Sequence, residues 1–121
     1  MADDDGYETH DFKVRRFGEV TIVRLKDENL TGVRETMRIG DELGLMVAGG
    51  VRKLVLDLKH VRYCGSVGLG MLIGVNNKMR DAGGQFVLSH TESIMQLLEV
   101  SRTTKLFRIA EDPKEALTMF K

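Results

Sequence analysis

The chain has 121 residues with 18 basic and 18 acidic side chains, so its net charge is zero and no overall field draws it to nucleic acid or anionic lipid. Its 42% hydrophobic and 30% charged residues are typical of one globular domain. One cysteine excludes an internal disulfide and a cysteine-based metal cluster, so we expect a cytoplasmic protein without metal or cofactor. The acidic start is unlike a signal peptide, and no run approaches the roughly 20 apolar residues of a membrane span.

The first quarter of the chain predicts a tail followed by a β-hairpin. Residues 1–10 are polar and acidic, so we expect a flexible tail before a domain over residues 11–121. Phe12–Phe17 partly alternates between apolar and polar residues, and Val20–Leu25 is largely apolar. A Gly18-Glu19 turn between them completes the pattern of a hairpin.

Helices and short strands then alternate to the end of the chain. We first expect a helix from Val33 that stops at Gly49-Gly50, and its apolar face would consist of Val33, Met37, Leu43, Met46 and Val47. A strand over 53–58, a helix from Ser66 to Gly83-Gly84 and a strand over 86–88 should follow. The chain should then form a helix capped by Thr91 and containing Ile94, Leu97 and Leu98, a strand over 106–109, and a helix from Pro113 to Phe120. This order predicts an α/β fold: a mixed, mostly parallel sheet of about 4–5 strands with about 4 helices.

The segment from Cys64 to Gly74 carries the strongest local signal. A serine directly before an apolar helix is a natural N-cap, because its hydroxyl can accept a bond from a first-turn amide, and Ser66 has this position. Gly68, Gly70 and Gly74 each weaken that helix by roughly 1 kcal/mol relative to alanine. We therefore expect another backbone or a partner to approach the helix closely, with helix–sheet packing favoured for Gly74.

The same segment allows interpretations without regulation. Ser66 can be a cap alone, and Cys64, beside an apolar stretch, is most simply a small core residue. His60 could reach either side chain and suggest acyl transfer, but no acid is placed to orient it and the G-x-S-x-G elbow is missing. The glycine spacing does not match a nucleotide-binding loop, and Arg15-Arg16 lacks the interleaved aromatics of a nucleic-acid surface.

Residues 56–70, LDLKHVRYCGSVGLG, resemble the signature of the STAS domain, the family of sulphate transporters and anti-sigma factor antagonists. The usual form of that signature is L-D-L-S-x-V-x-x-I-D-S-S/T-G-L-G, which aligns here without a gap. Further similar positions follow downstream, and they are Gly83-Gly84, Ile94, Leu97-Leu98, Thr103, Leu106-Phe107 and Ile109. The resemblance covers roughly residues 12–120, which is almost the whole chain.

The resemblance implies a bacterial protein-binding regulator rather than an enzyme. Stand-alone members are anti-sigma factor antagonists, which bind an anti-sigma factor that is also a serine kinase and thereby release the sigma factor. The kinase phosphorylates the first serine of the motif, which is Ser66 here, and a phosphatase resets the protein. The resemblance places the docking surface around this serine, at Gly65, Val67, Gly68 and Leu69.

Two departures from the family pattern lie on either side of Ser66. Gly65 stands where the motif has an aspartate, and Val67 stands where it has a second hydroxyl residue. The turn at residues 27–30, DENL, also differs from the family's G-E-L-D. The alternative is therefore a phosphorylation-independent STAS adaptor in a signalling scaffold or a lipid transport complex, and a small hydrolase is a remote third.

Overall fold

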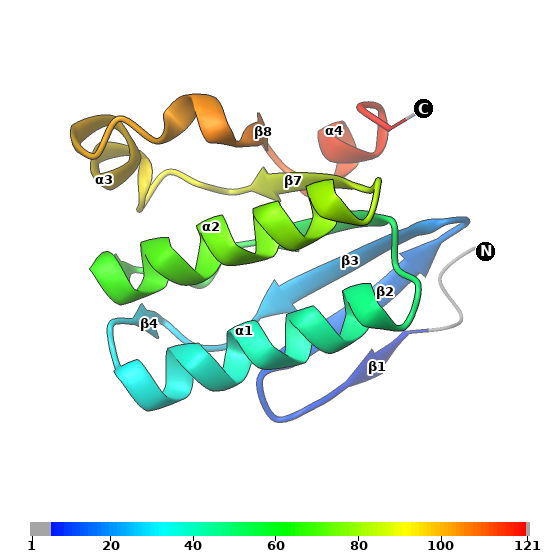
Figure 1. Cartoon of the computed structure of the whole chain (residues 1–121), viewed down its shortest axis with the longest axis horizontal. Coiled ribbons are helices and arrows are strands. Elements are labelled where there is room, and N and C mark those ends of the chain that lie inside the picture. Colours follow the sequence, from blue (N-terminus) through cyan, green and yellow to red (C-terminus); the bar gives the residue numbers. More distant parts are fainter. Residues whose placement is uncertain (1–5, 121) are drawn as a thin grey trace.

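The computed structural model describes residues 6–120, which form a central β-sheet covered by helices (Figure 1). The strands are β1 (Tyr7–Glu8), β2 (Phe12–Phe17), β3 (Val20–Leu25), β4 (Asn29–Leu30), β5 (Lys53–Asp57), β6 (Tyr63–Cys64), β7 (Gln85–Ser89) and β8 (Arg108–Ala110). The helices are α1 (Val33–Ala48), α2 (Ser66–Asp81), α3 (Met95–Val100), the 3₁₀ helix η1 (Thr104–Leu106) and α4 (Pro113–Leu117).

The main sheet is mixed and mostly parallel. Its described part has six strands in the order β1-β2-β3-β5-β7-β8. β1, β2 and β3 are antiparallel, and Gly18 takes the left-handed conformation (φ 60°) in the hairpin turn. β3, β5, β7 and β8 are parallel, with Leu56 opposite Val23 on one side and Leu88 on the other. The α/β prediction is confirmed, and β1 accounts for the strand beyond the expected number.

Apolar side chains fill both faces of this sheet. Leu54 and Leu56 of β5 belong to a large core beneath α1 and α2, whereas Val55 between them belongs to a smaller core beneath α4. This division follows from the period of two in a strand, which sends successive side chains to opposite faces. Figure 1 shows α1 and α2 side by side on one face, with α4 on the other. Within residues 6–120 no helix combines the length and hydrophobicity that crossing a bilayer requires.

Three predicted elements have different ends in the structure. The N-cap of α3 is Ile94 and not Thr91. Residues 91–94 form a turn before the helix, in which the Ile94 amide donates to the Thr91 carbonyl at 2.9 Å. Leu106 lies in η1 rather than in the last strand, which begins at Arg108. α4 ends at Leu117 rather than Phe120, because Met119 and Phe120 turn to pack on the smaller core.

The predicted tail is partly structured. Tyr7 and Glu8 form β1 by pairing with Val14 and Lys13, so the prediction of a flexible segment is wrong at these two residues. The first five residues of that predicted tail lie outside the described part of the chain, as does the last residue of the predicted domain.

An ion pair fixes α1 to the start of β2. Asp11 is buried and accepts hydrogen bonds from Nε and Nη2 of Arg38, each 2.9 Å long. The Arg38 guanidinium holds the pKa of the Asp11 carboxyl below its usual value. This bidentate contact ties α1 to the start of β2, while the helix buries Thr36, Ile39, Leu43 and Val47.

The predicted apolar face of α1 is wrong at its first turns. Val33 and Met37 are 61% and 58% exposed, although the pattern placed them on the buried side. The helix carries more apolar residues than its core face holds, so some of them remain at the surface.

A buried carboxylate joins the three central parallel strands where they end. Asp57 of β5 is 0% exposed, and its Oδ2 accepts a 2.7 Å bond from Nε of Arg24 on β3. Its Oδ1 accepts from the Ser89 hydroxyl of β7 at 3.2 Å and lies 2.6 Å from Nδ1 of His90. A charge removed from water is tolerated only with such partners.

We expect Asp57→Ala to lower the free energy of unfolding by about 3–5 kcal/mol, because Arg24 loses its counter-charge and two further polar groups lose a partner. Urea denaturation followed by far-ultraviolet circular dichroism measures this loss. Glu28→Ala is the control, since the Glu28–Arg62 pair is long (3.9 Å) and exposed and contributes about 1 kcal/mol or less. Equal losses in the two variants would contradict the structural role of Asp57.

Candidate functional site

A small second sheet holds the loop that leads to Ser66. β4 and β6 pair in parallel, with Asn29 opposite Tyr63 and Leu30 opposite Cys64. The Gly65 amide then donates to the Leu30 carbonyl at 3.2 Å, which continues this pairing to the start of α2. As a result, the segment after β3 fixes the entry to α2.

Ser66 is the first residue of α2 and not its N-cap. The cap is Gly65, whose backbone is extended (φ −103°, ψ −167°) and whose carbonyl accepts from the Leu69 amide at 3.0 Å. The prediction that Ser66 caps the helix is therefore wrong by one position, because the pairing of Gly65 with β4 keeps that residue extended. The Ser66 side chain is exposed and makes no hydrogen bond within the described structure.

The glycines of α2 have different surroundings. A Cβ on Gly68 would lie 2.6 Å from both Cys64 Sγ and the Leu30 carbonyl oxygen, so a close backbone approach is confirmed there. A Cβ on Gly70 or Gly74 would meet no atom within 4 Å, and the expected packing of Gly74 against the sheet is wrong. These two glycines face away from β4 and line a groove instead.

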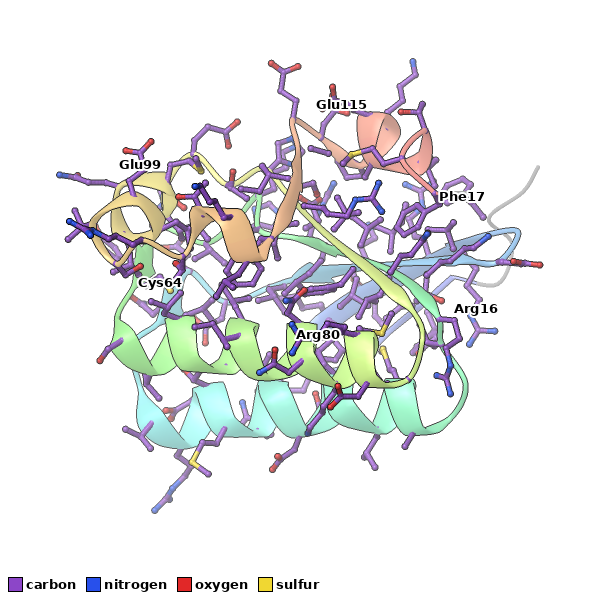
Figure 2. The ribbon with its side chains drawn as sticks, turned by 45° about the horizontal axis from the view of Figure 1, so that its top comes forward. Arg16, Phe17, Cys64, Arg80, Glu99 and Glu115 are labelled. Atoms are coloured by element: carbon purple, nitrogen blue, oxygen red, sulfur yellow. The ribbon has the colours of Figure 1, made fainter. Side chains whose placement is uncertain are left out.

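This α1–α2 groove has a volume of about 360 Å³ and runs between the two helices. Its apolar lining comes from Met37 on α1 and from Val67 and Met71 on α2. The helices start at the same end of the molecule, where Figure 2 labels Cys64. Ser66 is exposed and directly precedes Val67, which lines the groove. Its hydroxyl therefore lies beside one end of an apolar groove.

The remaining predicted contact residues are less accessible. Gly68 is buried, and Leu69 is half-buried with its side chain packed on the large core. Gly65 and Val67 are half-buried. Ser66 is thus the one exposed residue of the five that were predicted to form the docking surface.

Three apolar side chains near this end of the molecule are exposed, which the sequence pattern did not predict. Tyr63, which precedes the loop into α2, is 60% exposed. Val33 and Met37, in the first two turns of α1, are exposed to a similar degree. The surplus of apolar residues on α1 was the available signal, because a single buried face could not hold them all.

Cys64 and His60 form no catalytic arrangement with Ser66. Cys64 is half-buried and packs against the large core, as predicted for a small core residue, and burial raises the pKa of its thiol from 9.0 to about 11. Such a thiol is a poor nucleophile at neutral pH. His60 is exposed beside a different cleft and, among the described residues, makes no hydrogen bond to either side chain. No group of three or more His, Cys, Asp or Glu side chains within residues 6–120 is arranged to hold a metal ion.

Comparison with known proteins identifies relatives over most of the chain. The STAS domain family model matches residues 11–116. A protein of Bordetella bronchiseptica, provisionally named anti-sigma factor antagonist BtrV, is 31% identical over 81 residues, which cover 66% of this chain and 70% of the relative.

Two solved structures have the same fold. An anti-sigma factor antagonist from Mycobacterium paratuberculosis superposes with a TM-score of 0.77 at 23% identity, covering 89% of this chain and 91% of the other. The phosphorylated form of SpoIIAA, a cell fate determinant of Bacillus, superposes with a TM-score of 0.67 at 14% identity, covering 90% and 99%.

The two kinds of glycine in α2 give opposite expectations for alanine. Gly68→Ala should lower the free energy of unfolding by about 1–3 kcal/mol, because its methyl group overlaps the Leu30 carbonyl. Gly70→Ala should raise it by up to about 1 kcal/mol, since the new methyl group meets open space and alanine favours the helix. Urea denaturation of the two variants measures both effects, and stabilisation by Gly68→Ala would show that α2 does not depend on this contact.

Proposed function

The chain belongs to the STAS domain family, and on that premise we propose that it is an anti-sigma factor antagonist switched by phosphorylation of Ser66. In this proposal it binds a serine-kinase anti-sigma factor in a bacterial cytoplasm through Ser66 and its half-buried neighbours Gly65, Val67 and Leu69, together with the α1–α2 groove. The buried Gly68 contributes by holding α2 close to Leu30. The kinase phosphorylates Ser66 and the protein dissociates, and a phosphatase restores the binding form. The observation that carries the proposal is the exposed, unbonded Ser66 hydroxyl beside an apolar groove.

The position of Ser66 suits a modification that leaves the fold intact. A phosphate on the first residue of α2 would face the unpaired amides and the positive end of the helix dipole, which favour negative charge. Because the hydroxyl makes no bond in the described structure, its modification breaks no contact. The phosphorylated form of SpoIIAA has a similar fold, which supports the compatibility of this fold with a phosphate.

The surroundings of Ser66 suit a modification that prevents docking. Val33, Met37 and Tyr63 expose apolar side chains that a partner would cover. A phosphoserine adds about −1.5 to −2 charges at pH 7. Taking that charge out of water at an apolar interface is costly without a matching cation, so phosphorylation should favour the dissociated form.

The alternative is a phosphorylation-independent adaptor with the same docking surface. Gly65 and Val67 favour it, because they remove the aspartate and the second hydroxyl residue of the family motif. Such an adaptor would bind its partner regardless of the chemistry at Ser66, and binding measurements on variants of this residue separate the two functions.

We expect Ser66→Asp to weaken binding to the proposed serine-kinase anti-sigma factor by about tenfold or more, whereas Ser66→Ala should bind like the unmodified chain. Isothermal titration calorimetry gives the three dissociation constants. Asn77→Asp is the matched control, since it adds one charge about 16 Å further along the same helix. Asn77→Asp should bind like the unmodified chain. Equal affinity for the unmodified chain, Ser66→Ala and Ser66→Asp would exclude the switch and favour the adaptor.

The structure also allows a test of Gly65. A Cβ there would meet only Thr31 Cγ2, at 3.9 Å, and the extended backbone accepts any side chain. Gly65→Asp should therefore fold and restore a carboxylate beside Ser66 that can hold the hydroxyl or accept its proton. We expect phosphate incorporation by the kinase to rise by about 10²-fold or more, as measured by mass spectrometry.

Gly65→Asn controls for size, because it supplies a similar side chain without the negative charge. Equal rates for the asparagine and aspartate variants would exclude a role for the carboxylate. Rapid phosphorylation of the unmodified chain would show that Gly65 is no handicap, and no phosphorylation of any form would favour the adaptor.

A further inference from the structure

The face of the sheet opposite α1 and α2 is only partly covered. α4 is five residues long and packs over the smaller core beneath it. The hairpin of β2 and β3 extends beyond it, and a partly enclosed pocket of about 290 Å³ lies between the hairpin and the helix. We name this the β2–α4 pocket. It is separate from the α1–α2 groove, which lies on the other face.

The floor of the pocket is apolar. Phe17 and Ile22 come from the hairpin, and Pro113 and Leu117 come from α4. Phe17 and Leu117 both pack against the smaller core, and Figure 2 shows Phe17 next to α4. Four apolar residues from β2, β3 and α4 thus form a concave wall that an apolar group could fill.

The other side chains that line the pocket are all cationic. They are Lys13, Arg15, Arg24 and Lys114, and among the described residues no carboxylate contributes to the lining. Alternation along β2 puts Lys13, Arg15 and Phe17 on the same face, and Lys13 is directly opposite Arg24 of β3. In a chain of zero net charge, this is a local concentration of positive charge over an apolar floor.

Arg24 is arranged to donate into this space. Its Nε bonds the buried Asp57, which orients the guanidinium, and its two terminal nitrogens make no hydrogen bond within the described part of the chain. Lys13 and Lys114 likewise have no ion-pair partner among residues 6–120. Three cationic groups therefore retain hydrogen-bond donors for an acceptor that the described residues do not supply.

We propose that the β2–α4 pocket binds a small anionic amphiphile, with one carboxylate, sulfate or phosphate group and an apolar tail about the size of an octyl chain. The cations would hold the anionic group and the floor would hold the tail. A second cleft, at the loop after β5, is also partly basic, but Glu28 and Glu92 line it with the cations. Among residues 6–120 no carboxylate lines the β2–α4 pocket, which distinguishes it from this cleft and favours an anion.

Three ligands with one tail and different head groups test the charge requirement. Octanoate, 1-octanol and octylammonium are titrated into the ¹⁵N-labelled chain, and amide shifts are followed by NMR. Octanoate should cause saturable shifts in β2, β3 and α4 below its micelle-forming concentration, and it should bind about tenfold more tightly than the other two. Equal binding of the three, or no saturable shift with octanoate, would overturn the proposal.

Charge-removing variants locate the site. Lys13→Gln with Lys114→Gln should weaken octanoate binding by about tenfold, since each exposed cation contributes modestly. The control is Arg16→Gln with Lys105→Gln, which removes the same charge elsewhere, because Arg16 lies on the opposite side of β2 from Phe17 (Figure 2). This control should retain octanoate binding within about twofold. Equal loss in both double variants would show attraction by overall charge and overturn the site.

Vesicles distinguish a free amphiphile from a membrane. We expect the chain not to sediment with phosphatidylglycerol vesicles, because a partly enclosed pocket of this size takes a single tail. Sedimentation that depends on Lys13 and Lys114 would identify a lipid surface as the occupant and overturn the proposal of a free ligand.

Discussion

The buried carboxylate of Asp57 is the interaction on which both candidate sites depend. It bonds Arg24 of β3 and Ser89 of β7, so three parallel strands end in one polar cluster. The chain leaves β5 directly after this residue and enters the loop that leads to Ser66. The same carboxylate orients Arg24 at the edge of the β2–α4 pocket. Because an unpaired buried charge is costly, the cluster tolerates few arrangements of these strand ends.

A second constraint decides what Ser66 can do. Gly68 lets α2 approach the Leu30 carbonyl so closely that no side chain fits between them. This contact and the pairing of β4 with β6 hold Gly65 extended, which makes Gly65 the cap and leaves the Ser66 hydroxyl unbonded. A capping serine would have to break a hydrogen bond before it reacted. Gly65 therefore caps α2, and the hydroxyl of Ser66 stays exposed and free of hydrogen bonds within the described structure.

The sequence predicts what depends on local patterns and misses what depends on distant pairing. Continuous apolar runs identify β3, β5 and β7, because both of their faces are buried. The cap at Gly65 could not be predicted, since it depends on β4, more than thirty residues earlier in the chain. The exposure of Val33 and Met37 reflects the limited width of the buried face of α1, which Thr36, Ile39, Leu43 and Val47 fill. The β2–α4 pocket could not be predicted, since it forms between the β2–β3 hairpin and α4, which lie far apart in the chain.

The two faces of the sheet separate the two proposed activities. Ser66 and the α1–α2 groove lie on the α1–α2 face, whereas Lys13 and Lys114 line a pocket on the α4 face. The layer between them consists of close-packed strands whose central side chains are fully buried. Substitutions at distant sites without shared partners act additively. Exposed changes at Ser66 and at Lys13 or Lys114 therefore test different surfaces. A change at Asp57, which contacts the pocket residue Arg24 and precedes the Ser66 loop, would be expected to disturb both.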